Sequence, residues 1–283
     1  MLKTRILTAL IGIPIIFICI YIGGWLFFSL MFLINFFCVK EYLSICKKYQ
    51  PHTTASLIIS ILYFISLGLP QHFQINYLGP IQLSQSAVLM AYAVLIFLVF
   101  FVIEVIHNNP EKAVKRISIS FLGSFFFPTT LYFMVLIRDL YNGMAYIFLI
   151  FVTVWILDTA AFAVGKKFGK HKLSSNISPK KTIEGAIAGI VFGVLFSVVI
   201  GTYVFNLFYA WQSAILGLVI SVLGQFSDLA ESLIKRDAGI KDSGTIVPGH
   251  GGVLDRFDSY FFAAPIVYYV LIFLQGFNLL TKG

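Results

Sequence analysis

Stretches of about 20 mostly apolar residues recur along this chain of 283 residues, separated by short polar breaks. A stretch of that length allows an α-helix to cross the hydrocarbon core of a bilayer. Hydrophobic residues make up 59% of the chain and charged residues only 11%, which excludes an ordinary water-soluble domain. Backbone amides in lipid must be satisfied within the segment, and the stretches are too uniformly apolar for the strands of a membrane barrel. The sequence therefore predicts an all-α, polytopic integral membrane helix bundle.

We predict about nine transmembrane helices, with eight or ten left open. The expected spans are residues 2–22, 25–46, 56–69, 87–107, 117–137, 144–164, 184–209, 211–233 and 259–280. The third is short and the second carries Lys40 and Glu41 near its end, so either could be tilted, broken or interfacial. We expect one continuous membrane domain, in which residues 1–140 form scaffold helices and residues 141–283 carry the catalytic site.

The basic residues favour one orientation in the membrane. All 20 Lys and Arg residues except Arg138 and Lys282 fall on one side of the predicted bundle. By the positive-inside rule the N-terminus and the polar loops are cytoplasmic, and an odd number of spans places the C-terminus outside. We therefore expect a multi-pass protein of the cell's inner membrane. Because the net charge of +8 is spread over loops lying against a bilayer, anionic lipid and nucleotide phosphates are the expected partners, and nucleic acid is not.

The first half of the chain contains little that indicates catalysis. Its three cysteines lie in apolar stretches without metal-ligand spacing, so we expect free thiols packed as small hydrophobes: Cys19, Cys38 and Cys46. Glu104, Arg138 and Asp139 lie at predicted span ends, where a solvated or snorkelling side chain suffices.

Charged residues and glycines instead concentrate between Ser232 and Asp258. Acids can hold a metal ion, cations can contact phosphate oxygens, and glycine amides can approach a ligand closely. This combination is typical of a site for a metal-bound polyphosphate. The order of residues is Ser232-x-x-Lys235-Arg236, then Lys241-Asp242-x-Gly244, then His250-Gly251-Gly252-x-x-Asp255-Arg256-x-Asp258.

This pattern resembles the signature of the phosphatidate cytidylyltransferases, also called CDP-diacylglycerol synthases. Residues 158–165 and 178–185 are also similar to family elements, so the specific resemblance covers roughly the C-terminal half. Val247 stands where the family more often has Leu, Ile or Phe, which is a conservative difference. Residues before about 150 match only in general character.

The resemblance implies transfer of a cytidylyl group from CTP to phosphatidic acid, giving CDP-diacylglycerol and pyrophosphate. It also implies that Asp228, Asp255 and Asp258 together hold Mg²⁺, with Glu231 as a further candidate ligand. A second cation and a homodimer are left open. The role of His250 is likewise open: it could contact phosphate, transfer a proton or orient a neighbour. The expected catalytic residues are Asp228, Lys241, His250, Asp255 and Asp258.

Two interpretations remain open for each acid of this set. Glu231 follows Asp228 by one helical turn, which suggests a metal site or proton path, but it also stands four residues before Lys235 and could simply pair with it. Asp255 and Asp258 precede the last span and could be helix caps. Hard carboxylate oxygens suit Mg²⁺, and one histidine does not make a zinc site.

A second group of candidates lies inside the sixth predicted span and in the polar segment between the sixth and seventh spans. The basic segment 178–182 comes just before a helix and could bind an anion at its N-terminus or serve only as a basic juxtamembrane loop. Asp158, inside the span, should face the bundle interior and bond either to substrate or to another helix. We assign Lys166, Lys167, Lys170 and Lys172 to the basic loop alone. The expected substrate-binding residues are Asp158, Ser178, Lys180, Lys181, Thr182, Lys235, Arg236, Gly251, Gly252 and Arg256, and Lys241 is also expected to contact phosphate.

Two other functions stay open at this point. A lipid kinase that uses CTP and acts on a polyprenol-type lipid would need similar acids and cations, and its product would be a simple phosphomonoester. A cation-coupled transporter would also have acids at membrane depth. The clustering of the charges at one face, with no second polar set opposite, disfavours the transporter.

Overall fold

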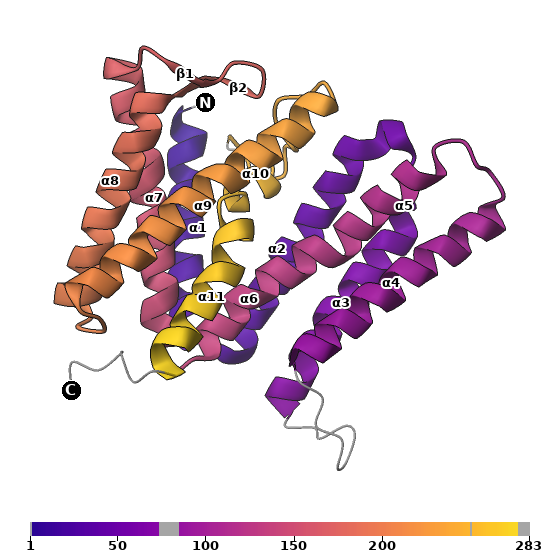
Figure 1. The fold of residues 1–283 in the computed structure, drawn as a ribbon, viewed down its shortest axis with the longest axis horizontal. Helices are drawn as coiled ribbons and strands as arrows, with labels where there is room; N and C mark the ends of the chain where they lie inside the picture. Colours follow the sequence, from indigo (N-terminus) through magenta and orange to yellow (C-terminus); the bar gives the residue numbers. More distant parts are fainter. Residues whose placement is uncertain (1, 74–84, 250, 277–283) are drawn as a thin grey trace. The chain divides into compact units, whose positions relative to one another are not determined.

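The computed structural model describes residues 2–73, 85–249 and 251–276, and Figure 1 shows the order of the elements along the chain. The chain divides into two compact units. One contains residues 1–132 and 242–254, and the other contains residues 133–241 and 255–283. The division into scaffold and catalytic halves near residue 140 stays a prediction.

The first unit is built from apolar helices in an up-and-down order. Its elements are α1 (Leu2–Ile22), α2 (Gly24–Ile45), the 3₁₀ turn η1 (Cys46–Tyr49), α3 (Thr53–Phe73), α4 (Gln85–His107), α5 (Ala113–Phe121), the π-helical turn η2 (Leu122–Phe126) and the beginning of α6 (Phe127–Asp139). Gly23 and Gly24 both have positive φ, at 70° and 50°, so a glycine pair makes the break between α1 and α2. Tyr63 and Phe100 belong to a buried cluster where α3 packs against α4.

A buried group of charges lies inside this unit and contradicts the expectation of a solvated Glu104. The Glu104 side chain is only 6% exposed, and Arg116 is 2% exposed. Arg116 Nε donates to Glu104 Oε1 at 3.0 Å, and His52 Nε2 lies 2.7 Å from Glu104 Oε2. A buried carboxylate is costly unless it is paired, and here Arg116 of α5 and His52, the residue before α3, are the partners of Glu104.

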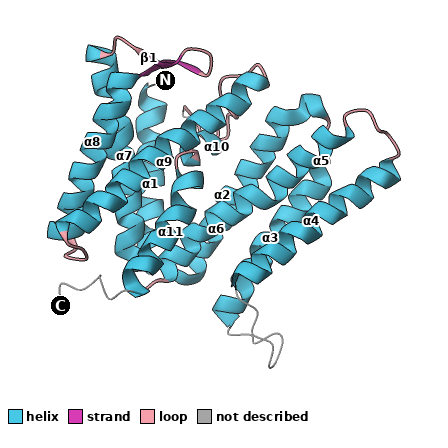
Figure 2. Ribbon diagram, in the orientation of Figure 1, coloured by secondary structure: helices cyan, strands magenta, loops and turns pink. Residues whose placement is uncertain are grey.

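The second unit begins with the rest of α6 and continues with longer helices and one short hairpin. Its further elements are α7 (Gly143–Phe168), β1 (Lys172–Ser174), β2 (Ser178–Thr182), α8 (Ile183–Val198), the π-helical turn η3 (Val199–Val204), α9 (Ala210–Asp237), the end of the short helix α10 (Leu254–Phe257) and α11 (Tyr260–Gly276). The two strands are antiparallel, with Lys172 opposite Thr182 and Ser174 opposite Ser178. Figure 2 shows the hairpin as a small β element in a chain of helices.

Glycines allow α7 and α8 to approach closely. A Cβ at Gly189 would lie 2.8 Å from Leu157 Cδ1, and one at Gly185 would lie 2.6 Å from the carbonyl oxygen of Ala161. Both distances are below normal van der Waals contact. Small residues four apart therefore set the spacing of these helices, as is common where helices pack in membranes.

The membrane architecture predicted from the apolar stretches is confirmed. Within the described residues, seven helical stretches are long and apolar enough to cross a membrane: Gly24–Tyr49, Val88–His107, Ala113–Asp139, Gly143–Phe168, Ile183–Val204, Ala210–Asp237 and Leu254–Gln275. Two shorter apolar helices, Leu10–Ile22 and Thr53–Gly68, correspond to the first and third predicted spans. The last four residues of the ninth predicted span lie outside the described part of the chain. The three cysteines are buried and none forms a disulfide bond, as expected.

Candidate active site

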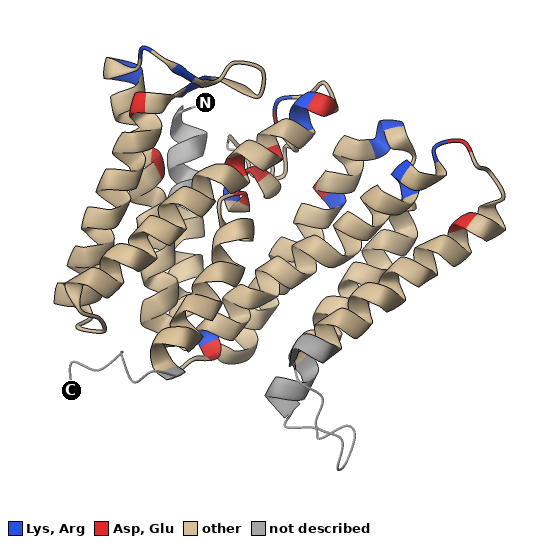
Figure 3. Cartoon of the chain, in the orientation of Figure 1, with Lys and Arg blue, Asp and Glu red and all other residues tan. Residues whose placement is uncertain are grey.

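Charged side chains of the second unit gather at one end of its helices. Figure 3 shows them at the end of α7, α8 and α9 that carries the β1–β2 hairpin, with a further pair at the opposite end. The long apolar bodies of the helices lie between these two ends. A polar site in this unit is therefore at the end of the helices that carries the hairpin.

A cavity of about 670 Å³ lies at this end, between α7, the hairpin, α8 and α9. Six of the predicted site residues line it: Asp158, Ser178, Lys180, Lys181, Thr182 and Asp228. Asp158 is exposed to this space rather than buried between helices. The cavity has the size of a typical small-ligand pocket, and its wall contains both cations and carboxylates.

Two further polar residues in the wall were not among the predicted set. Lys166, assigned from the sequence to the basic loop alone, lines the cavity from α7. Gln225 lines it from α9 and donates from Nε2 to the carbonyl oxygen of Ala186 at 3.0 Å. Lys166 follows Asp158 by about two helical turns, so the two residues lie on the same face of α7. This spacing in the sequence could have indicated that Lys166 also lines the cavity.

The hairpin places its lysines because its two ends are held. At the end of β2 the Thr182 side chain caps α8, accepting from the Gly185 amide at 3.1 Å. Glu184, in the first turn of α8, lies 2.6 Å from His171 Nδ1 on the other side of the hairpin. Lys181 forms an ion pair with Asp228 of α9, with both side chains partly exposed. The segment 178–182 is therefore an ordered strand and helix cap rather than a loose basic loop.

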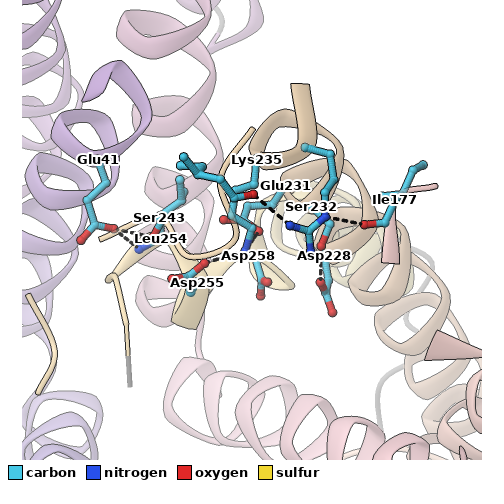
Figure 4. Close-up of polar contacts among 12 residues, drawn as sticks. Glu41, Ile177, Asp228, Glu231, Ser232, Lys235, Ser243, Leu254, Asp255 and Asp258 are labelled. Atoms are coloured by element: carbon cyan, nitrogen blue, oxygen red, sulfur yellow. Dashed lines mark hydrogen bonds and ion pairs between the residues drawn. The ribbon is translucent and has the colours of Figure 1, made fainter. Parts of the chain in front are cut away.

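A second group of charges lies near the C-terminal end of α9. Lys235 Nζ lies 2.6 Å from Asp255 Oδ1, and the same ammonium group pairs with Glu231 one turn earlier (Figure 4). The three side chains are 5–10% exposed. The pairing of Glu231 with Lys235 expected from their spacing is therefore present, and Lys235 holds two carboxylates at once.

Asp258 connects the start of α11 to α9. Its Oδ1 accepts from the Ser259 amide at 2.6 Å, and its backbone carbonyl accepts from the Ser227 hydroxyl. The Asp258 carboxylate interacts electrostatically with Asp158, Asp228 and Glu231. A bond to the amide just before α11 agrees with the cap interpretation, whereas the gathering of like charges agrees with a cation site.

The carboxylates suit a magnesium ion in chemistry, and the expected triad of Asp228, Asp255 and Asp258 stays a prediction. Among the residues that the structure describes, no three Asp, Glu, His or Cys side chains converge as ligands around one point. Asp255 is engaged with Lys235 instead. Mg²⁺ is, however, commonly held by one or two carboxylates together with water and substrate phosphates. Asp228 and Asp258 interact electrostatically, and these two carboxylates are enough for that mode of Mg²⁺ binding.

The other predicted residues that the structure describes are not part of the cavity wall. Arg236 donates from Nε to the Ile177 carbonyl oxygen at 3.1 Å and from Nη1 to that of Ile240 at 2.9 Å, so it joins the hairpin turn to the residues after α9. Lys241 and Arg256 are exposed, and Arg256 interacts electrostatically with Asp158. His250 lies outside the described residues.

The glycines of the motif shape a loop that belongs to the first unit. The Gly251 carbonyl oxygen accepts from the Val247 amide at 2.9 Å, and Gly249 and Gly251 have φ of 77° and 89°. Gly252 approaches Ser243 and Glu41 so closely that a Cβ would lie 2.8 Å from the Glu41 carboxyl carbon. Contact of these amides with phosphate stays a prediction.

A cavity lined by lysines and carboxylates at the end of apolar helices is suited in charge and size to a small phosphorylated ligand. Comparison with known proteins identifies the family of the chain. Residues 3–274 match the model of the cytidylyltransferase family, so this chain belongs to that family and is a nucleotidyltransferase.

Relatives of known name match over almost their whole length. The chain is 31% identical to a phosphatidate cytidylyltransferase of Synechocystis sp., over 95% of this chain and 96% of the relative. It is 34% identical to the enzyme of that name from Staphylococcus saprophyticus and 35% identical to that from Staphylococcus haemolyticus, in each case over 96% of this chain and 99% of the relative. The family expected from the motif is therefore confirmed.

Proposed function

We propose that this enzyme transfers the cytidylyl group of CTP to phosphatidic acid. The observation that carries the proposal is the cavity whose wall combines Lys166, Lys180 and Lys181 with Asp158 and Asp228 at the polar end of apolar helices. Its volume of about 670 Å³ is sufficient for a nucleotide. The names of the relatives point to the same reaction.

The reaction requires no nucleophile from the protein. A phosphate oxygen of phosphatidic acid attacks the α-phosphorus of CTP and forms a new P–O bond. The bond from that phosphorus to the oxygen bridging to the β-phosphorus breaks, and pyrophosphate leaves with the electron pair. Two anions must meet, so the work of the protein is to align them and to neutralise their charge.

Different residues of the described structure serve to align the substrates and to neutralise their charge. Lys166, Lys180 and Lys181 offer ammonium groups to the polyphosphate, and the Lys181–Asp228 pair keeps one of them oriented before substrate binds. Lys235 neutralises Glu231 and Asp255 in the absence of substrate. The apolar helices beside the cavity leave the acyl chains of the second substrate in lipid, where water is absent.

We also propose that Mg²⁺ assists, held by Asp228 and Asp258 with Asp255 and Glu231 as further candidates. The electrostatic interaction among Asp158, Asp228, Glu231 and Asp258 supports this, because a divalent cation offsets that repulsion. When bound, the ion supplies positive charge beside the phosphates. A second ion and a homodimer are left open.

The orientation in the cell is part of the proposal. The lysines and arginines at the polar end of the second unit favour a cytoplasmic face in the inner membrane, where CTP is dissolved. The same positive charge favours an anionic lipid and a nucleotide over a neutral solute.

One assay tests the reaction. The purified protein in detergent, with phosphatidic acid, labelled CTP and Mg²⁺, should form a lipid that mass spectrometry identifies as CDP-diacylglycerol, together with pyrophosphate. A metal-free sample should be inactive. A product that is a simple phosphomonoester would instead indicate a lipid kinase, and solute uptake into proteoliposomes without CTP turnover would indicate a transporter.

A further inference from the structure

Glu41, near the C-terminal end of α2, is a buried carboxylate in the half of the chain where the sequence shows no catalytic pattern. Only 4% of the residue is exposed. A buried carboxylate is expensive to desolvate and persists where several donors satisfy it. Its partners are more than 200 residues away in the sequence.

Three donors converge on this carboxylate, and all of them belong to the loop that contains the glycine motif. Ser243 Oγ donates to Oε2 at 2.9 Å, the Leu254 amide donates to Oε2 at 2.8 Å, and the Val253 amide donates to Oε1 at 3.0 Å. Figure 4 shows Glu41 with Ser243 and Leu254. Both ends of the segment 243–254 are therefore attached to one side chain.

The glycines of the loop fit around this side chain. A Cβ at Gly244 would lie 2.6 Å from Glu41 Oε1, and a Cβ at Gly252 would lie 2.8 Å from the carboxyl carbon. Neither position leaves room for a larger residue. A further bond, from the Thr8 hydroxyl of α1 to the Pro248 carbonyl oxygen at 2.9 Å, holds the middle of the loop.

The attachment ends one residue before the acids of the proposed reaction. The amide of Leu254 is bonded to Glu41, and the next residue is Asp255, which pairs with Lys235. Asp258 follows Asp255 by three residues. A shift of the Leu254 backbone is transmitted to Asp255 through one peptide bond. We propose that Glu41 is a positioning residue, which holds the loop 243–254 and so fixes the backbone from which Asp255 and Asp258 project. This rests on the proposed function, since the acids matter only if they serve the reaction.

The test compares Glu41→Gln with two matched variants in the full-length protein in detergent. Glutamine has the same shape but one carbonyl acceptor, so its NH₂ group would face a backbone N–H. Glu111→Gln changes an exposed side chain in the same half of the chain. Glu104→Gln changes a buried glutamate with no bond to the loop in the structure described, and it reports a purely structural effect.

We expect two effects in Glu41→Gln. Hydrogen exchange of the peptide that covers residues 243–254 should become faster, by roughly 10- to 100-fold, because the amide of either Val253 or Leu254 would face an NH₂ group in place of its acceptor oxygen. The kcat for CTP turnover should fall by a similar factor with little change in the KM for CTP, and the Mg²⁺ concentration for half-maximal activity should rise. Glu104→Gln should lower thermal stability without accelerating exchange in the loop, and Glu111→Gln should change neither quantity.

Gly244→Ala provides a second variant if Glu41→Gln does not fold. This variant keeps the Glu41 side chain, but the new Cβ would lie 2.6 Å from Glu41 Oε1 and would force the carboxylate away from the loop. It should therefore reproduce the faster exchange and the lower kcat. Faster exchange with unchanged kcat would overturn the positioning role, and so would a lower kcat with unchanged exchange. Hydrogen exchange needs no substrate, so a wild-type protein that fails to turn over CTP would refute the proposed function and leave the attachment measurable.

Discussion

At the scale of residues, several charges of the second unit lie in ion pairs with specific partners. Lys181 pairs with Asp228, while Lys235 serves both Glu231 and Asp255 with side chains that are 5–10% exposed. Buried pairs of this kind contribute little net stability, but removal of one partner leaves an uncompensated charge. A substitution in one of these ion pairs therefore removes one side chain and also leaves the charge of its partner uncompensated.

Asp255→Asn should reduce CTP turnover by at least about a thousandfold while membrane insertion is retained, because both a candidate ligand and the partner of Lys235 are lost. Steady-state kinetics with purified protein measures this. If Asp255 only neutralises Lys235, then Asp255→Asn should cost nothing further in a Lys235→Gln background. Near-full activity of the single variant would remove Asp255 from the site.

Lys166→Ala should raise the KM for CTP by about threefold to tenfold with kcat unchanged, because an exposed cation in the cavity wall contributes to binding of substrate and transition state alike. Lys167→Ala is the matched control, since Lys167 is adjacent, exposed and outside the set that lines the cavity. Equal effects of the two substitutions would show that Lys166 acts only through the general basic charge of the loop.

At the scale of elements, close approach and buried charge decide how helices pair. Glycines at positions 185 and 189 bring α8 against α7, and Glu104 of α4 connects Arg116 of α5 with His52 before α3. The close approach of α7 and α8 depends on glycines, which have no side chain. The contact around Glu104 depends on the pairing of each buried charge.

Arg116→Gln should lower the thermal stability of the protein, because Glu104 would lose the guanidinium group that pairs with it. Thermal unfolding in detergent, monitored by circular dichroism, measures the loss. The double variant Glu104→Leu with Arg116→Met removes both charges and should recover part of the stability. A double variant less stable than the single one would show that the pair itself is strongly stabilising.

At the scale of the whole molecule, the chain is a membrane enzyme whose architecture follows from the length of its apolar helices. Seven long helices and two shorter apolar ones in the described residues account for the predicted spans. The two compact units are discontinuous in sequence, because residues 242–254 belong with the N-terminal helices. The orientation of the molecule in the membrane is open to direct test.

Single cysteines at the two ends of α7 should report that orientation in a variant whose three native cysteines are replaced by alanine. Tyr141, before α7, is 97% exposed, and Lys172, after it, is also exposed. We expect a membrane-impermeant maleimide to label Tyr141→Cys in intact cells and Lys172→Cys only after permeabilisation, because the basic end should be cytoplasmic. The opposite labelling pattern would reverse the proposed orientation.

The sequence by itself determined the helical membrane architecture and the family, since a run of apolar residues forces a helix in lipid and the motif is contiguous. Six polar residues of the cavity wall were also predicted, because charged and hydroxyl side chains such as Lys180, Lys181 and Asp228 stand out within or next to the apolar spans. Only the tertiary structure decided that Asp255 pairs with Lys235, that Lys166 lines the cavity and that Glu41 holds the glycine loop. The physical reason is distance along the chain: Glu41 and Ser243 are separated by 202 positions, and no local pattern encodes which donors will satisfy a buried carboxylate.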